Sequence, residues 1–108
     1  MTVHDITELD DETHAAFIEE HATALVLYHA TWCGWCQQFK PVYESLRTAA
    51  IGKCAIGIVN SKHSCAADVT ANGVPVVVRY ADGKEVDRFE GYASQEKFME
   101  WVNGSINQ

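Results

Sequence analysis

The chain contains 108 residues with a mass of 12.0 kDa, a size at which we expect one domain spanning residues 1–108. Its composition, with 47% hydrophobic and 21% charged residues, is that of an ordinary globular protein and excludes a disordered chain or a collagen-like repeat. A formal net charge of −7 argues against nucleic-acid binding, which needs a basic surface.

Short apolar runs alternate with segments whose apolar residues recur at helical spacing. In chain order they first predict an edge strand at 2–7, a helix at 12–21 and a buried strand at 24–28. A helix follows that begins in the segment 31–36 and runs to about residue 50, with an interruption at Pro41. The remaining elements are a buried strand at 54–59, a short helix at 61–70, strands at 76–80 and 85–89, and a helix capped by Ser94. Asp10 or Asp11 offers a cap for the first helix, and Asp82–Gly83 is typical of a hairpin turn. This order predicts an α/β fold, a mixed central sheet with helices on both faces.

The negative charge lies entirely in residues 1–39, which contain no lysine or arginine, whereas residues 40–108 are balanced. The acidic stretch is either the solvated face of a helix or a docking surface for a basic partner.

No apolar run approaches the roughly 18 residues of a membrane span, and residues 1–12 lack the features of a secretory signal. We therefore expect a cytoplasmic protein with no membrane contact, in a compartment where stable disulfides are rare.

Two of the four cysteines form a close pair, Cys33-Gly34-Trp35-Cys36, directly after a buried strand and at the start of a helix. Free backbone N–H groups and the helix dipole favour negative charge on the first sulfur, and thiols placed there ionise more readily than free cysteine. We therefore expect Cys33 to be a nucleophile. Cys36, one turn into the helix, is expected to be more buried and protonated, and to serve as the internal attacker that releases the product.

A zinc site is the alternative interpretation of such a pair, but zinc usually needs a second pair of ligands at comparable spacing. Cys54 and Cys65 stand alone, so we expect no metal site. These two cysteines are interpreted as small apolar residues. A regulatory or intermolecular disulfide is the alternative, for which Cys65 is the better candidate.

Four landmarks in register resemble the thioredoxin family: the segment 30–36 (ATWCGWC), Pro41, the segment 73–75 (GVP) and Gly91. The resemblance covers essentially the whole chain. It implies the thioredoxin fold, with a mixed five-stranded central sheet flanked by four helices. It also implies that Pro41 kinks a long helix and that the Val74–Pro75 peptide bond is cis beside the cysteines.

By the same resemblance, a groove receives the substrate chain, with the backbone of Val74 pairing to it as to an added strand. The groove residues are Trp32, Gly34, Trp35, Val74, Pro75 and Gly91.

The resemblance implies a protein dithiol–disulfide oxidoreductase that reduces protein disulfides through Cys33 and Cys36. The expected partners are disulfide-containing proteins and a thioredoxin reductase that depends on NADPH or ferredoxin. The chain itself is expected to act as a monomer without a cofactor. Two alternatives stay open: a disulfide isomerase or oxidase of the same fold, and a non-catalytic interaction module.

Two positions depart from the family. Leu27 stands where members typically bury a carboxylate that takes the proton of the second cysteine, and a lysine common on the next strand is missing from 55–58. The proton acceptor for Cys36 is then water, the departing substrate thiolate, or His29, whose alternative role is plain packing at a strand end. Trp35 brings no charge between the cysteines, which favours the reducing end of the family.

Overall fold

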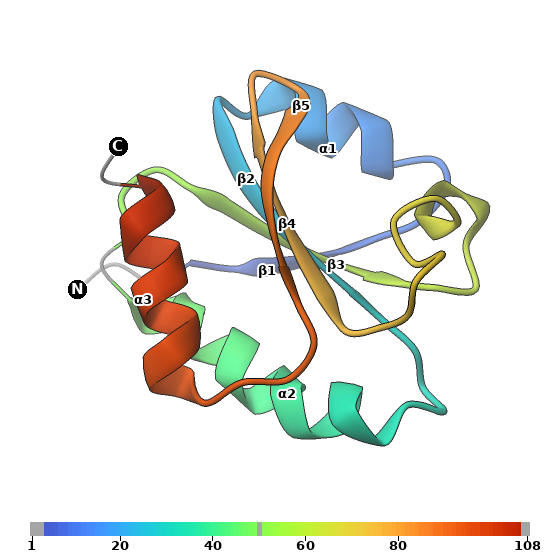
Figure 1. Ribbon diagram of the computed structural model, residues 1–108. Coiled ribbons are helices and arrows are strands. Elements are labelled where there is room, and N and C mark those ends of the chain that lie inside the picture. Colours follow the sequence, from blue (N-terminus) through green and yellow to red (C-terminus); the bar gives the residue numbers. More distant parts are fainter. Residues whose placement is uncertain (1–3, 50, 107–108) are drawn as a thin grey trace.

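The computed structural model describes residues 4–49 and 51–106, which form five strands and three α-helices around one sheet (Figure 1). The strands are β1 (Ile6–Leu9), β2 (Thr23–His29), β3 (Ala55–Asn60), β4 (Val76–Ala81) and β5 (Lys84–Glu90). The helices are α1 (His14–Glu20), α2 (Gly34–Glu44) and α3 (Gln95–Ile106), with short 3₁₀ turns at Ser45–Thr48 and Ser64–Ala66.

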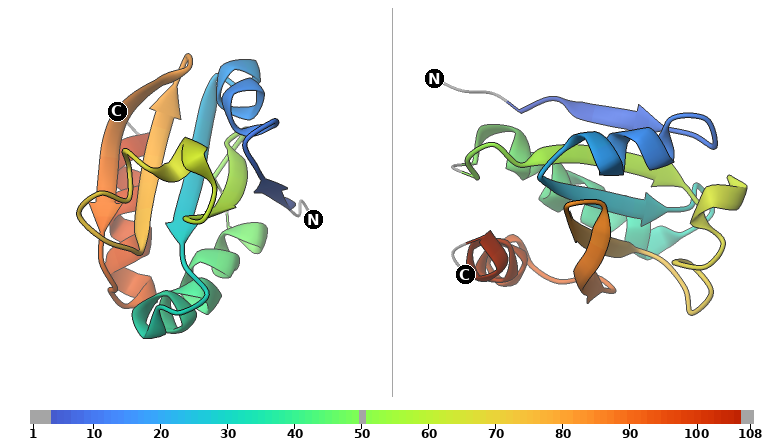
Figure 2. Two further views of the ribbon diagram at one scale, coloured as in Figure 1. Left: turned by 90° about the vertical axis from the view of Figure 1, so that its right-hand side faces the viewer. Right: turned by 90° about the horizontal axis from the view of Figure 1, so that it is seen from above.

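The sheet has the strand order β1-β3-β2-β4-β5. Strands β1, β3 and β2 run parallel, whereas β4 is antiparallel to β2 and β5 is antiparallel to β4. Helix α1 covers one face, and α2 with α3 covers the other, as the views in Figures 1 and 2 show. The predicted class, a mixed five-stranded sheet with helices on both faces, is confirmed.

Alternating side chains of β2 supply both halves of the core. Leu25 and Leu27 pack with residues of α2 and α3, while Val26 and Tyr28 pack with residues of α1. All four are 0% exposed. A strand buried on both faces has to be apolar throughout, and each such side chain contributes about 1.5–3 kcal/mol relative to exposure.

The α1 face accommodates its polar groups through a short chain of hydrogen bonds. His14 Nε2 lies 2.6 Å from the Tyr28 hydroxyl, which lies 2.7 Å from the Tyr80 hydroxyl. The buried hydroxyl groups of these two tyrosines are tolerated because each has a hydrogen-bond partner.

On the same face, a Cβ added at Gly57 would lie only 2.8 Å from Leu9 Cδ1, so a glycine there lets β1 and α1 pack closely on β3.

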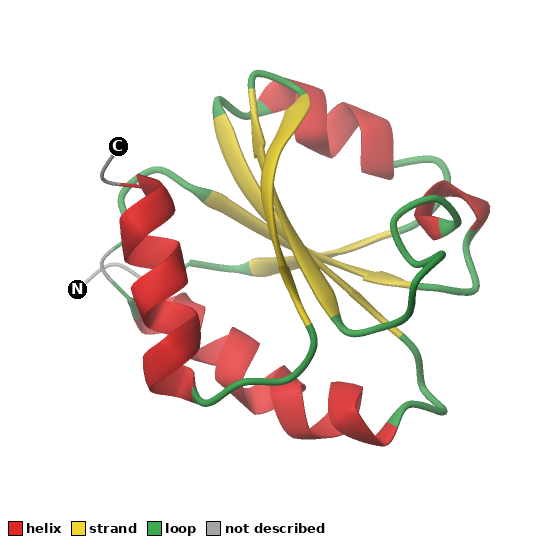
Figure 3. Cartoon of the chain, viewed as in Figure 1, coloured by secondary structure: helices red, strands yellow, loops and turns green. Residues whose placement is uncertain are grey.

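The structure corrects the predicted number of helices. The helix expected at 61–70 is only the 3₁₀ turn Ser64–Ala66, and most of the segment between β3 and β4 is loop (Figure 3). Asp11 holds this turn, because its Oδ1 accepts hydrogen bonds from the Cys65 N–H at 2.7 Å and the Ser64 hydroxyl at 3.1 Å. These contacts with a residue more than fifty positions away override the helix that the local spacing of apolar residues in 61–70 favours. Residues 4–49 and 51–106 therefore contain three α-helices, not four.

Other predicted boundaries shift by a few residues. The edge strand expected at 2–7 is observed at Ile6–Leu9, and residues 1–3 lie outside the described part of the chain. The helix expected to reach residue 50 ends at Glu44 and continues as a 3₁₀ turn; Pro41 lies inside it and offers no N–H to the helix.

The predicted turn and cap residues are met in part. The N-cap residue of α1 is Thr13, which has no side-chain cap. Asp10 Oδ1 instead accepts hydrogen bonds from the N–H groups of Glu12 and Thr13 in the turn just before α1. Asp82 and Gly83 have φ angles of 52° and 83° in the β4–β5 turn. The Ser94 hydroxyl accepts from the Lys97 N–H at 3.3 Å at the start of α3.

Candidate active site

The close cysteine pair lies at the first turn of α2, where β2 ends and the chain turns into the helix. Cys33 is the N-cap residue, with extended backbone, and its Sγ accepts a hydrogen bond from the Cys36 N–H at 3.1 Å. The first free N–H groups of a helix carry partial positive charge, so this sulfur sits where negative charge is stabilised. The Cys33 thiol also lies 3.7 Å from the Val74 carbonyl oxygen, to which it donates.

Cys36 is enclosed more fully than Cys33. The two residues are 3% and 7% exposed, and they pack together with Ala30 and Val74. Burial, with a second contribution from the hydrogen bond to Cys33, raises the pKa of the Cys36 thiol to about 12. Cys36 is therefore held in its protonated form at neutral pH, whereas the sulfur of Cys33 faces a positive helix end.

A hollow of about 320 Å³ opens beside this pair, lined by Trp35, Val74, Pro75, Gly91 and Tyr92. The Val74–Pro75 peptide bond is cis, as the resemblance implies. The Gly91 N–H donates to the Pro75 carbonyl at 2.9 Å, and Gly91 adopts the positive φ of 83° that favours glycine. Two loops that are distant in sequence are thus held together against the start of α2.

The structure brings together four of the predicted groove residues, Trp35, Val74, Pro75 and Gly91. Gly34 lines an adjacent hollow together with Trp35. Trp32 is 80% exposed and lines neither of the two hollows. The six residues thus do not share one surface.

Sequence reasoning missed Tyr92 and Gln38. Tyr92 lines the larger hollow, and Gln38 lines the adjacent one. An aromatic residue directly after the glycine expected in the groove was the available signal for Tyr92. Gln38 gave no signal, because a glutamine on an exposed helix face is ordinary.

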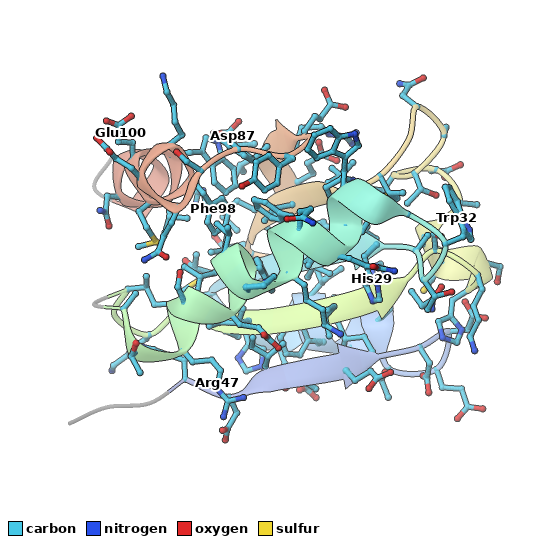
Figure 4. The ribbon with its side chains drawn as sticks, turned by 90° about the horizontal axis from the view of Figure 1, so that it is seen from below. His29, Trp32, Arg47, Asp87, Phe98 and Glu100 are labelled. Atoms are coloured by element: carbon cyan, nitrogen blue, oxygen red, sulfur yellow. The ribbon has the colours of Figure 1, made fainter. Side chains whose placement is uncertain are left out.

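His29 lines a different cavity, which lies between α2 and the sheet and has a volume of about 220 Å³. Figure 4 shows His29 behind α2, apart from Trp32. The other residues lining this cavity are Ile6, Glu8, Lys40, Glu44, Arg47 and Ile58. Burial, followed by the nearby Lys40 cation, lowers the pKa of His29, so its imidazole is neutral at pH 7.

Leu27 occupies the position where the family typically buries a carboxylate. It is 0% exposed, stands between Ile58 and Val77 in the sheet register, and belongs to the same cluster as Phe39. The sheet beneath the cysteine pair is thus apolar at this position.

The other two cysteines lie apart from the pair. Cys54 is 5% exposed in the core beneath α2 and α3, whereas Cys65 lies on the α1 side in the turn held by Asp11. Burial raises the pKa of both thiols to about 11. All four cysteines are free, and no group of three or more potential metal ligands is found within residues 4–49 and 51–106. In the same residues, no helix is both long and apolar enough to span a bilayer.

Comparison with known proteins places these features in a family. The family described as thioredoxin matches residues 5–104. Thioredoxin of Staphylococcus aureus is 30% identical over 102 residues, which cover 93% of this chain and 94% of that protein. Thioredoxin of Chlamydia caviae is 37% identical over 86 residues, which cover 76% of this chain and 83% of that protein.

Longer proteins and solved structures agree with this. Protein disulfide-isomerase A5 of mouse is 26% identical over 102 residues, and this chain spans only 20% of its length. The crystal structure of a thioredoxin from Malassezia sympodialis superposes with a TM-score of 0.85 at 19% identity, covering 98% of this chain and 95% of that one, which shows the shared fold. With the family match over residues 5–104 and the cysteine pair at the start of α2, the chain belongs to the thioredoxin family.

Proposed function

We propose that the protein is a dithiol–disulfide oxidoreductase that reduces disulfide bonds in other proteins. The thiolate of Cys33 attacks a substrate disulfide, forming a Cys33–substrate disulfide and releasing one substrate thiolate, which takes up a proton. Cys36 then loses its proton and attacks Cys33 Sγ. This step forms the Cys33–Cys36 disulfide and releases the second substrate thiol, so that two electrons and two protons pass to the substrate.

One observation carries this proposal: the Cys36 N–H donates to Cys33 Sγ at 3.1 Å at the first turn of α2. The same contact stabilises a thiolate on Cys33 and keeps the two sulfur-bearing residues close enough for the second attack. The burial of Cys36 supports the order in which the two cysteines attack, because its thiol stays protonated and unreactive while the Cys33 thiolate attacks the substrate.

The groove supports a polypeptide substrate. Val74 lies beside Cys33, and an extended substrate chain pairing with the Val74 backbone would bring its disulfide to Cys33 Sγ. We propose that Trp32, Gly34, Trp35, Pro75 and Gly91 form the surrounding contact surface. The partners would be disulfide-containing proteins and a reductase, dependent on NADPH or ferredoxin, that restores the dithiol of a cytoplasmic monomer.

The proton of Cys36 needs an acceptor at the release step. His29 lines a separate cavity with Lys40, and this supports water or the departing substrate thiolate over the imidazole. Leu27 offers no carboxylate for this purpose.

An insulin-reduction assay tests the proposal. With dithiothreitol as the electron source, the wild-type protein should accelerate the precipitation of insulin chains, Cys33→Ser should not, and the matched control Cys65→Ser should equal the wild type. Full function of Cys33→Ser in its biological role would instead favour a non-catalytic interaction module that binds through Trp32, Trp35 or the acidic N-terminal stretch.

The similarity to protein disulfide-isomerase A5 favours one second candidate, an isomerase-like role. Equilibration of the cysteine pair with defined redox buffers separates the two. We expect a reduction potential near about −270 mV, the value typical of a reductant, because Trp35 supplies no cation between the cysteines. A potential near about −180 mV would instead indicate isomerase-like poise.

A further inference from the structure

Tyr92 and Trp35 form an aromatic pair beside the reactive cysteine. Their ring centroids lie 5.5 Å apart with a tilt of 35° between the planes. Trp35 belongs to the first turn of α2, and Tyr92 comes from the loop between β5 and α3. The side chains are 64% and 45% exposed, which leaves much of each ring open to solvent. Large aromatic groups exposed together at a hollow commonly mark a binding surface.

The ring of Tyr92 is held in place by contacts with the core. It meets Phe39, a fully buried residue one helical turn after Trp35, edge to face with centroids 6.3 Å apart. Phe39 in turn packs against Phe89 and Phe98 in the core. The loop carrying Tyr92 is tied to the Pro75 loop through the Gly91 N–H. The Trp35–Tyr92 pair therefore forms a pre-organised wall of the hollow, so binding of a ligand requires little loss of side-chain conformational entropy.

The hollow that this wall bounds begins at the cysteine pair, because Val74 both lines it and accepts the hydrogen bond from Cys33. Its five lining residues, Trp35, Val74, Pro75, Gly91 and Tyr92, carry no charge. About 320 Å³ of space is enough for one large side chain. An uncharged hollow with two aromatic rings in its lining selects for apolar groups that bury area and stack, and gives no partner to a charged group.

We propose that Tyr92 is a specificity-determining residue which, together with Trp35, binds an aromatic or large aliphatic side chain adjacent to the disulfide cysteine of the substrate. The inference rests on the proposed reduction of protein disulfides and adds the class of substrate. Proteins whose reducible cysteine is flanked by phenylalanine, tyrosine or leucine are preferred over those with small polar flanking residues.

Two disulfide-linked peptide dimers test this. Each monomer has the sequence glycine–X–cysteine–X–glycine, with X either phenylalanine or serine. The reduced protein is mixed with each dimer, the reaction is quenched with acid, and the second-order rate of reduction is followed by mass spectrometry. We expect the wild type to reduce the phenylalanine dimer about tenfold faster than the serine dimer. In Tyr92→Ala the ratio should fall to within about twofold of unity, mainly through the phenylalanine dimer.

Matched variants separate specificity from damage. Tyr92→Phe keeps the ring and should keep the preference, Tyr92→Leu keeps bulk and should keep part of it, and Val86→Ala removes an exposed apolar side chain on β5 and should change nothing. Hydroxyethyl disulfide carries no large side chain, so its rate reports the chemistry of the cysteine pair, and the rate for each dimer is expressed relative to it in every variant. Thermal melts report whether each variant folds.

The outcomes are distinct. Equal rates for the two dimers in the wild type, or a preference that survives undiminished in folded Tyr92→Ala, would overturn the specificity role while leaving disulfide reduction intact. A wild-type protein that reduces neither the dimers nor hydroxyethyl disulfide would show that the proposed function is wrong, and the inference falls with it.

Discussion

The first turn of α2 and the rest of the chain hold cysteines of very different character. Cys33 and Cys36 share one hydrogen bond at a helix N-terminus, next to an open hollow. Cys54 is enclosed in the core, and Cys65 is tied to a carboxylate through its backbone. The comparison teaches that placement decides the role of a thiol. A helix N-terminus favours the thiolate at Cys33, whereas burial opposes it at Cys36, Cys54 and Cys65, and Asp11 adds to this at Cys65.

A second contrast lies within the site. The rim is aromatic and open, whereas the sheet below it is apolar at Leu27, between Ile58 and Val77. A buried carboxylate at that point would assist the release step but would cost stability. This chain has the apolar arrangement, and in the proposed mechanism the high pKa of the Cys36 thiol would limit the release step.

Cys36→Ser gives the largest expected difference between the two kinds of cysteine. Turnover with insulin should fall by at least about a hundredfold, because the Cys33–substrate disulfide forms but is then released only by slow attack of the external dithiol. Cys54→Ser and Cys65→Ser, assayed alongside at a temperature where all variants are folded, should stay within about twofold of wild type. Turnover by Cys36→Ser close to the wild-type rate would contradict the assignment of the second attack.

Leu27→Asp tests the apolar layer beneath the pair. We expect the free energy of unfolding to fall by roughly 2–4 kcal/mol, because burial of apolar area is lost and an ionisable group enters a dry site. Urea unfolding measures the change, and Leu27→Asn is the matched control of similar shape that cannot ionise. Burial raises a carboxyl pKa, so the excess loss in the aspartate variant should grow as the pH rises from 4 to 8. A variant as stable as the wild type would refute this account.

The pH dependence of product release tests the state of Cys36. Burial is the largest cause of the raised pKa of its thiol, and this cause persists in the Cys33–substrate disulfide, so the attacking thiolate is a small fraction at neutral pH. The single-turnover rate of release should therefore rise about tenfold per pH unit between pH 7 and 9, with no plateau. A plateau within that range would mean that Cys36 ionises far more easily than its burial implies.

Cys54→Val gives the smallest expected effect. Burial raises the pKa of the Cys54 thiol from 9 to about 11, so between these values the folded protein keeps a proton that the unfolded chain has lost. Unfolding is then favoured as the pH rises, and stability is lost from pH 9 to 11. Urea midpoints at pH 8 and 10.5, in the presence of a reductant, should show a smaller loss in Cys54→Val than in wild type. Identical losses would mean that this thiol does not titrate as its burial requires.

The sequence predicted those parts of the fold whose pattern is local. The apolar run of β2 and the Asp82–Gly83 turn were recognisable because a strand buried on both faces and a tight hairpin each need particular residues. The segment 61–70 was predicted wrongly as a helix, because its conformation depends on Asp11, a contact that no local pattern reveals.

The candidate site divides in the same way. The cysteine pair could be predicted from its spacing, and the Val74–Pro75 and Gly91 loops from resemblance to a family. Tyr92 could not, since its role depends on meeting Trp35 across two loops. The placement of His29 in a separate cavity likewise follows from the packing of α2 on the sheet, not from its four-residue distance to Cys33.

The difference among the four thiols can be measured directly. The reduced protein is treated at pH 7 with one equivalent of iodoacetamide, and the site of modification is located by peptide mass spectrometry. The structure predicts modification at Cys33, with Cys36, Cys54 and the partly exposed Cys65 essentially unmodified, because the pKa of each of these three thiols is raised to about 11 or 12. Modification spread evenly over the four cysteines, or found first at Cys65, would contradict the account.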